Sequence, residues 1–186
     1  MILLALDQSS SHTGFAIVKD GKLLETGCIN VPASQDLFAR TCTMCEDIIT
    51  LMDRCKPDFL CLEEIYGLPG RYTALKALAI VRGALIYVWW KRTKGYPLVI
   101  GCSSARAQLG IKGNAKKDEV MAAVNAKFNL KLTNEHEADA VVIAIIGNEL
   151  LDGAQKSTVP TQRAASVKTS SSTKKILKKM MKKGKK

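Results

Sequence analysis

The sequence predicts an α/β domain with a five-stranded mixed sheet, in which three antiparallel strands are followed by two parallel strands and helices flank the sheet. Three observations lead to this fold class. The run ILLALD is apolar up to Asp7, as in a buried central strand. Two further apolar runs flank Asp20-Gly21, which suits a two-residue hairpin because both turn positions favour positive φ. After residue 34, strands alternate with helices, as crossover connections between parallel strands require.

The first crossover helix and the strand after it have clear boundaries. Ser34 is a good N-cap, and apolar positions then recur at helical spacing until Lys56-Pro57 breaks the pattern. The run FLCLEE follows as a second buried strand that ends in Glu63 and Glu64. We expect this strand to lie beside the first, so that two neighbouring strands end in carboxylates.

The remaining elements include one helix of unusual composition. Residues 73–92 form a helical pattern that is apolar on nearly every face, so this helix needs more than one apolar neighbour. A fifth strand (YPLVIG), a short helix (SSARAQLG) and a basic loop (IKGNAKK) follow. Two further helices, DEVMAAVNAKF and EHEADAVVIAIIGNELL, complete the domain, and the second has its acids in the first turn, where they suit the helix dipole.

Charge divides the chain into two parts. The formal net charge is +11, and eleven of the 28 basic residues lie after residue 153, where there is no Asp or Glu. Residues 1–153 are therefore formally neutral and form the predicted folded domain. Residues 154–186 are predicted to be a flexible basic tail, because such a dense block of like charge cannot bury enough apolar surface to become ordered. Nucleic acid is the expected target of this tail, and a membrane surface is the alternative. The tail lysines expected to bind DNA are Lys174, Lys175, Lys178 and Lys179.

The six cysteines are predicted to be reduced. The one C-x-x-C pair, Cys42 and Cys45, falls within a predicted helix and has no second pair to complete a zinc site, so packing in the core is the expected role. No targeting segment is visible, and the apolar run before Asp7 is much shorter than the roughly 20 residues of a membrane span. These features predict a cytoplasmic protein without membrane contact, in a bacterium or in the host of a virus.

Four residues are candidates for a metal site. Asp7 and Glu63 end two strands, and His136 and Asp139 share a face of the last helix because they are three residues apart. Oxygen ligands with at most one imidazole suit Mg²⁺ or Mn²⁺. A pair of such ions, roughly 3.5 to 4 Å apart, stabilises the attacking and leaving oxygens of a phosphodiester displacement. Seventeen acidic residues would produce such groups by chance, but a carboxylate that closes an apolar strand has no structural use there. This placement favours hydrolysis of a nucleic-acid strand.

Four blocks of the sequence also resemble those of RuvC-type Holliday-junction resolvases, in the same order and over roughly residues 1–150. The blocks are LALDQSSSHTGFAIV, CLEEIYG, ALKALAIVRGALI and HEADAVVIAI. The resemblance implies a ribonuclease-H-like fold and a structure-selective endonuclease of DNA recombination and repair. It implies paired symmetric cuts in a four-way DNA junction, with two Mg²⁺ ions per active site and Mn²⁺ as a substitute. A compact resolvase with a tail would suit a virus.

The family pattern implies a role for each of the four candidate ligands. One acid ends the first strand, one lies on the fourth strand, and a pair three residues apart opens the last helix. In this sequence these positions are Asp7, Glu63, His136 and Asp139, which would bind the metal and form the catalytic site. The family has Asp or His at the third position, so His136 is a permitted variant.

The same resemblance implies contacts with DNA and with a second copy of the chain. Tyr66 matches an aromatic residue near the junction centre and could stack on an unpaired base, although it could also cap the edge of the core. Lys117 matches a lysine that approaches the scissile phosphate, where it could neutralise developing charge as a catalytic residue, although it could also lie in a solvated loop that only binds phosphate. The helix of residues 73–92 would form a homodimer whose two-fold symmetry matches that of the junction. The other basic residues of the domain expected to bind DNA are Arg71, Lys112 and Lys116.

Several alternatives remain open. The run LDQSSSHTG also resembles the phosphate loop of actin-like ATPases and sugar kinases, but those enzymes need two such domains. A flap or fork nuclease of the same superfamily, or a non-catalytic DNA-binding protein, would also fit the sequence. Within the site, Glu135 remains possible in place of His136, whereas Glu137 should point away from Asp139. His12 is interpreted as a turn residue. The run QSS replaces the glycine usual after the first acid, which leaves the shape of that turn open.

Overall fold

The computed structural model describes residues 1–67, 70 and 72–156, and in this part of the chain five strands form one sheet in the order β3-β2-β1-β4-β5. Strands β1, β2 and β3 pair antiparallel, and β4 and β5 continue the sheet in parallel from β1. The predicted fold class is therefore confirmed. The strands are β1 (Ile2–Asp7), β2 (His12–Lys19), β3 (Lys22–Asn30), β4 (Phe59–Glu63) and β5 (Leu98–Ile100).

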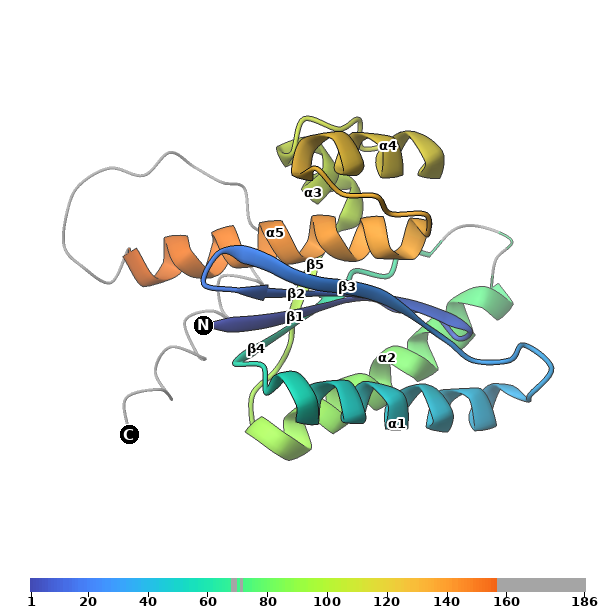
Figure 1. The fold of residues 1–186 in the computed structure, drawn as a ribbon. Helices are drawn as coiled ribbons and strands as arrows, with labels where there is room; N and C mark the ends of the chain where they lie inside the picture. The colour runs from blue at the N-terminus through green and yellow to red at the C-terminus, as the bar shows by residue number, and fades with distance from the viewer. Residues whose placement is uncertain (68–69, 71, 157–186) are drawn as a thin grey trace.

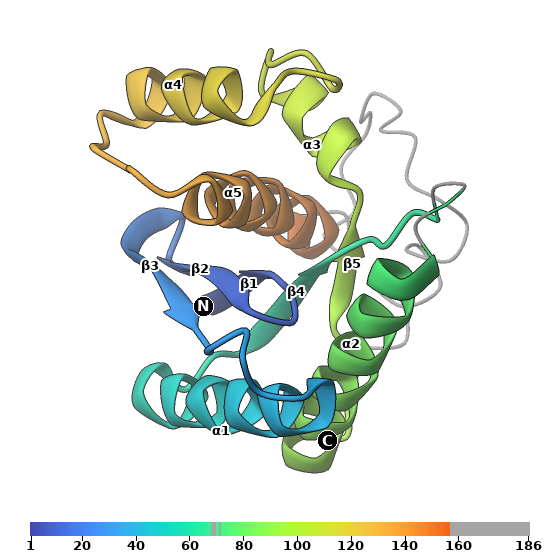
Figure 2. The same ribbon diagram turned by 90° about the vertical axis from the view of Figure 1, so that its right-hand side faces the viewer.

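Helices cover both faces of this sheet (Figure 1). On one face lie α1 (Leu37–Cys55) and α2 (Tyr72–Thr93), which pack against each other. On the other face α5 (Glu135–Lys156) runs across β1 and β2, and α3 (Cys102–Gln108) and α4 (Lys117–Phe128) lie beyond it (Figure 2). The predicted tail lies almost entirely outside the described residues, since α5 continues to Lys156.

Local signals explain most of the boundaries. Asp20 and Gly21 both have positive φ, at 49° and 79°, as the predicted hairpin between β2 and β3 requires. The predicted N-cap of α1 at Ser34 is wrong. Asp36 is the cap, and its carboxylate accepts hydrogen bonds from the backbone of Phe38 and Ala39. Ser34 instead lies in a turn that begins at Pro32 and delays the helix by two residues.

Two apolar clusters, one on each face of the sheet, make up the core. Met44, Ile48 and Leu85 belong to the cluster under α1 and α2, and the middle of α5 fills the other cluster. Of the C-x-x-C pair, Cys45 packs in the core as predicted, but Cys42 faces solvent. The six cysteines are all free thiols.

Helix α5 lies unusually close to the sheet because glycines stand at its crossing points. A Cβ at Gly14 of β2 would overlap the backbone carbonyl of His136 in the first turn of α5. Further along, a Cβ at Gly147 would lie 2.6 Å from the Cys61 sulfur on β4. Since Gly14 pairs with Asp7 in the sheet, the close crossing brings the start of α5 over the end of β1.

Helix α2 has one buried face and one exposed apolar face. Val81, Leu85 and Trp89 are buried against the core, whereas Tyr87 is 59% exposed and Trp90 is 37% exposed. Of the described helices, α2 alone is long and apolar enough to span a membrane by length and composition. No described residue covers the exposed apolar face of α2. This is the face for which the sequence predicts a second apolar neighbour.

Candidate active site

Asp7 and Glu63 stand at the ends of the neighbouring parallel strands β1 and β4. Asp7 is buried, at only 7% exposed, and Glu63 is partly buried. Two apolar strands therefore bring two carboxylates to one edge of the sheet, as expected from the sequence.

The first turn of α5 carries His136 and Asp139 to the same edge. His136 Nδ1 lies 2.6 Å from Asp7 Oδ2, which joins residues 129 positions apart. Asn134 fixes the start of the helix, because its side-chain oxygen accepts a hydrogen bond from the His136 backbone N–H at 2.8 Å. Of the neighbouring acids, Glu137 points toward β3 and accepts from Thr26 Oγ1 at 3.0 Å.

Asp139 is held by an arginine that the sequence analysis did not single out. Arg106 of α3 donates from Nη2 to both carboxylate oxygens, at 2.6 and 2.8 Å, and from Nε at 3.1 Å. The pair is nearly buried, with side chains 13% and 10% exposed. The Cys102 thiol donates to the same carboxylate at 3.4 Å. No sequence signal marks a lone arginine in a short helix, because its partner is 33 positions away.

Burial dominates the electrostatics of the two strand-end acids. Burial, together with a hydrogen bond and the charge of the neighbouring Asp7, raises the pKa of Glu63 to about 9. Burial also raises the pKa of Asp7 to about 6, against the opposing effect of its hydrogen bond with Glu63. At neutral pH the pair therefore keeps one proton. A cation bound between the two carboxylates would displace this proton.

His136 is neutral at physiological pH. Burial lowers the pKa of its imidazole, and the nearby charge of Lys117 lowers it further. With Asp7 ionised, the proton of the imidazole belongs on Nδ1, which faces that carboxylate, and Nε2 keeps a free lone pair. A neutral imidazole of this kind can bind a metal ion.

These side chains suit a hard divalent cation by their chemistry. Asp7, Glu63 and Asp139 offer carboxylate oxygens and His136 offers one imidazole, a donor set typical of Mg²⁺ and Mn²⁺ sites. Within the described ranges no three His, Cys, Asp or Glu side chains already enclose a common point. Asp139 is turned toward Arg106 and His136 toward Asp7. The donors are thus assembled at one edge, with two of them in contacts that a cation would have to share.

The neighbouring acids and lysines occupy the rim. Glu64 turns away from Glu63 and pairs with Arg82 of α2 at 2.7 Å. Glu135 forms an ion pair with Lys117 at the start of α4, and its Oε1 lies 4.0 Å from His136 Nε2. This pair places Lys117 beside the site.

The other predicted DNA contacts are exposed or lie outside the described residues. Tyr66 is 64% exposed, and a Cβ at Gly101 would lie 2.6 Å from its hydroxyl, so the ring lies over the glycine that precedes α3. Lys112 and Lys116 are exposed in the loop before α4. Arg71 and the tail lysines Lys174, Lys175, Lys178 and Lys179 lie outside the described residues.

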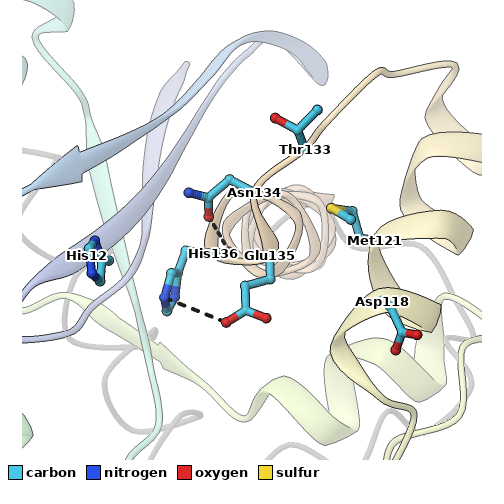
Figure 3. A pocket seen from close by; sticks show the side chains of 7 residues that line it. All are labelled: His12, Asp118, Met121, Thr133, Asn134, Glu135 and His136. Atoms are coloured by element: carbon cyan, nitrogen blue, oxygen red, sulfur yellow. Dashed lines mark hydrogen bonds and ion pairs between the residues drawn. The ribbon is translucent and has the colours of Figure 1, made fainter.

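His12 is part of the site rather than a simple turn residue. It is the first residue of β2, its Nδ1 lies 2.7 Å from Asn30 Oδ1, and its ring stacks on that of His136 with centroids 6.1 Å apart. Figure 3 shows both rings on the wall of an open hollow. No sequence pattern indicates this stacking, because it depends on the packing of α5 on β2. The hollow is lined by His12, Asp118, Met121, Thr133, Asn134, Glu135 and His136.

Comparison with known proteins finds one consistent set of relatives. The family model described as "Crossover junction endodeoxyribonuclease RuvC" matches residues 3–147. The RuvC endonuclease of Brachyspira hyodysenteriae is 26% identical over 149 residues, which cover 78% of this chain and 92% of that protein. The RuvC of Moorella thermoacetica is 27% identical over 153 residues, covering 78% and 89%. Among solved structures, Thermus thermophilus RuvC with a Holliday junction substrate has a TM-score of 0.64 at 19% identity, covering 78% and 90%.

Proposed function

The chain belongs to the RuvC family of crossover junction endodeoxyribonucleases, and from this premise we propose that it resolves four-way DNA junctions by hydrolysing one phosphodiester bond in each of two strands. The observation that carries the proposal is the meeting of Asp7, Glu63, His136 and Asp139 at one edge of the sheet. These are the four residues that the family pattern assigns to catalysis.

Divalent cations complete the proposed site, two per active site, with Mg²⁺ as the natural ion and Mn²⁺ as a substitute. Asp7, Glu63, His136 and Asp139 would hold them. When bound, such ions stabilise the attacking and leaving oxygens of an in-line displacement at phosphorus. The burial of Asp7 and the partial burial of Glu63 support this assignment, because neighbouring carboxylates withdrawn from water need either a shared proton or a cation.

The chain's own residues orient the site and contact the substrate. Asp7 holds the His136 ring through Nδ1, and Arg106 holds the Asp139 carboxylate through two oxygens. Lys117 pairs with Glu135, whose Oε1 lies 4.0 Å from His136 Nε2, and it can neutralise charge on the scissile phosphate once it leaves Glu135.

DNA would cross the edge of the sheet where these residues meet. The exposed Lys112 and Lys116 can contact phosphates beside the site, and the exposed Tyr66 ring can stack on an unpaired base near the junction centre. We also propose that Arg71 and residues 154–186 bind DNA, on the strength of their charge alone.

Paired cuts require two active sites, and we propose that α2 provides the dimer interface. Ile80, Tyr87 and Trp90 recur at helical spacing on its exposed side, and the Tyr87 and Trp90 rings stack at 6.4 Å. A two-fold axis through this face would relate two sites as the two strands of a junction are related. Free thiols throughout the chain agree with a cytoplasmic location.

Cleavage assays on matched four-way, three-way, flap and linear DNA, with Mg²⁺ and with Mn²⁺, test this function. We expect cleavage of the four-way junction at paired positions, abolished in Asp7→Asn and in Glu63→Gln while junction binding persists. Asp47→Asn, on the exposed side of α1, is the control and should cut normally. Preferred cutting of flaps would instead support the flap-nuclease alternative, and binding without metal-supported cleavage would support a non-catalytic protein.

A further inference from the structure

One buried amide joins the two strands that carry Asp7 and Glu63. Gln8, which directly follows Asp7, is only 3% exposed. Its Nε2 donates to the Glu63 carbonyl oxygen at 2.8 Å, and its Oε1 accepts from the Glu63 backbone N–H at 2.9 Å. A single side chain therefore satisfies both backbone groups of the Glu63 residue.

These two bonds begin where the backbone pairing of the sheet stops. The parallel register between β1 and β4 runs from Leu3 opposite Phe59 to Leu6 opposite Leu62, and includes neither acid. Past that point the Gln8 amide takes the place of the neighbouring backbone. Because the amide is planar and makes both bonds, it fixes the position and the direction of the Glu63 backbone relative to β1.

The turn after Gln8 is built to hold it in this position. The Ser9 backbone N–H donates to Thr13 Oγ1 at 3.2 Å, and Ser9 Oγ accepts from the His12 backbone N–H at 2.9 Å. Thr13 is fully buried. The run QSS thus forms a turn closed by side-chain hydrogen bonds rather than by glycine, which settles the shape of this turn.

We propose that Gln8 is a positioning residue that sets the spacing of the Asp7 and Glu63 carboxylates for catalysis. The inference rests on the proposed function, because it assigns these two acids to the cation site. Both polar atoms of Gln8 bond to the Glu63 backbone and the side chain is buried, so Gln8 acts through that residue rather than by touching the DNA. A neutral amide is well suited to this place, since it joins two acidic residues without adding charge.

The test uses Gln8→Met, which keeps the length of the side chain and removes both hydrogen bonds. The control is Gln35→Met, because Gln35 is an exposed glutamine in the loop before α1. Partners that orient metal ligands typically affect metal affinity or activity by about 10- to 100-fold. We expect Gln8→Met to lower kcat and to weaken Mn²⁺ binding, measured by calorimetry without DNA, each by at least about tenfold. KM and the junction dissociation constant should stay within about twofold, and Gln35→Met should match wild type.

Two further results make the outcome decisive. If Gln8→Met fails to fold, Gln8→Glu serves as the second variant, because it keeps the acceptor but replaces the donor with a charge. It should show the same losses of kcat and of Mn²⁺ affinity. Wild-type kcat and Mn²⁺ affinity in the folded variant, or an equal loss of junction affinity, would overturn the inference. A wild-type chain that binds Mn²⁺ but cuts no junction would instead refute the proposed function, because the Mn²⁺ comparison does not depend on cleavage.

Discussion

Replacing Asp7 by Asn should stabilise the protein in the absence of metal, although it removes a proposed catalytic acid. Asp7 is buried, and burial is the main reason that its pKa rises from 3.8 to about 6. Asn at this position imitates the protonated carboxyl group, and its oxygen can still accept the hydrogen bond from His136 Nδ1. The substitution therefore removes the free-energy cost of holding a charge at this place.

The pKa shift gives the size and the pH range of the effect. A rise of about 2 units corresponds to about 3 kcal/mol between the protonated and ionised forms. The folded-state pKa is the higher one, so protonation favours the folded state below about pH 4, and this stabilisation is lost as pH rises through 6. The free energy of unfolding of Asp7→Asn should therefore exceed that of wild type by on the order of 3 kcal/mol at pH 8. At pH 4 the difference should be below about 1 kcal/mol. For a chain of this length, 1 kcal/mol shifts Tm by roughly 2 to 4 °C.

Thermal unfolding in EDTA at pH 4 and at pH 8 measures this difference directly. Asp47→Asn, an exposed substitution on α1, controls for the loss of a charge and should leave Tm nearly unchanged. Added Mn²⁺ should raise the Tm of wild type more than that of Asp7→Asn, because binding to the folded state stabilises it. If Asp7→Asn is no more stable than wild type at pH 8, or if its advantage is the same at both pH values, the buried charge of Asp7 does not destabilise the fold.

Four other outcomes are expected. Gly14→Ala should destabilise the fold by on the order of 3 kcal/mol and lower cleavage, because the new methyl group overlaps the His136 carbonyl. Chemical denaturation measures the change in stability, and junction assays measure the change in cleavage. His136→Asp should keep metal-dependent cleavage and His136→Ala should lose it, and an active Ala variant would show that Glu135 or another residue is the ligand. Tyr87→Asp should give monomers in sedimentation and end paired cutting, whereas a monomeric wild type would exclude the α2 interface. Removal of residues 154–186 should reduce the salt dependence of junction binding by a slope of roughly 0.9 for each phosphate that the tail neutralises, and an unchanged slope would mean that the tail does not touch DNA.

The fold followed from the sequence wherever the signal is local. Asp20-Gly21 predicted the hairpin, and the apolar runs that end at Asp7 and Glu63 predicted two central strands. The sequence favours Ser34 as the cap of α1, whereas the cap is Asp36, because both residues are good caps and the turn at Pro32 decides between them. Local patterns could not show which face of α2 is buried, since that depends on how α1 packs against it.

The site was less accessible to sequence reasoning. The convergence of Asp7, Glu63, His136 and Asp139 was an expectation from strand ends and family spacing. Other contributions come from residues whose partners are distant in the sequence, so no periodicity or spacing marks them. These are Gln8 on the Glu63 backbone, Arg106 on Asp139, and His12 against His136. In each case the chemistry of the side chain is ordinary and only the packing gives it a role.

The close crossing of α5 over β2 at Gly14 also determines when, during synthesis, the four residues of the proposed site can come together. During synthesis the amino-terminal part folds first, and it can form a sheet that carries Asp7 and Glu63. His136 and Asp139 join them only when α5 docks, so the last described element to be synthesised completes the set of proposed ligands (Figure 1). A product interrupted by premature termination before residue 135 would lack half of these ligands. On the proposed function, such unfinished copies should not cleave DNA.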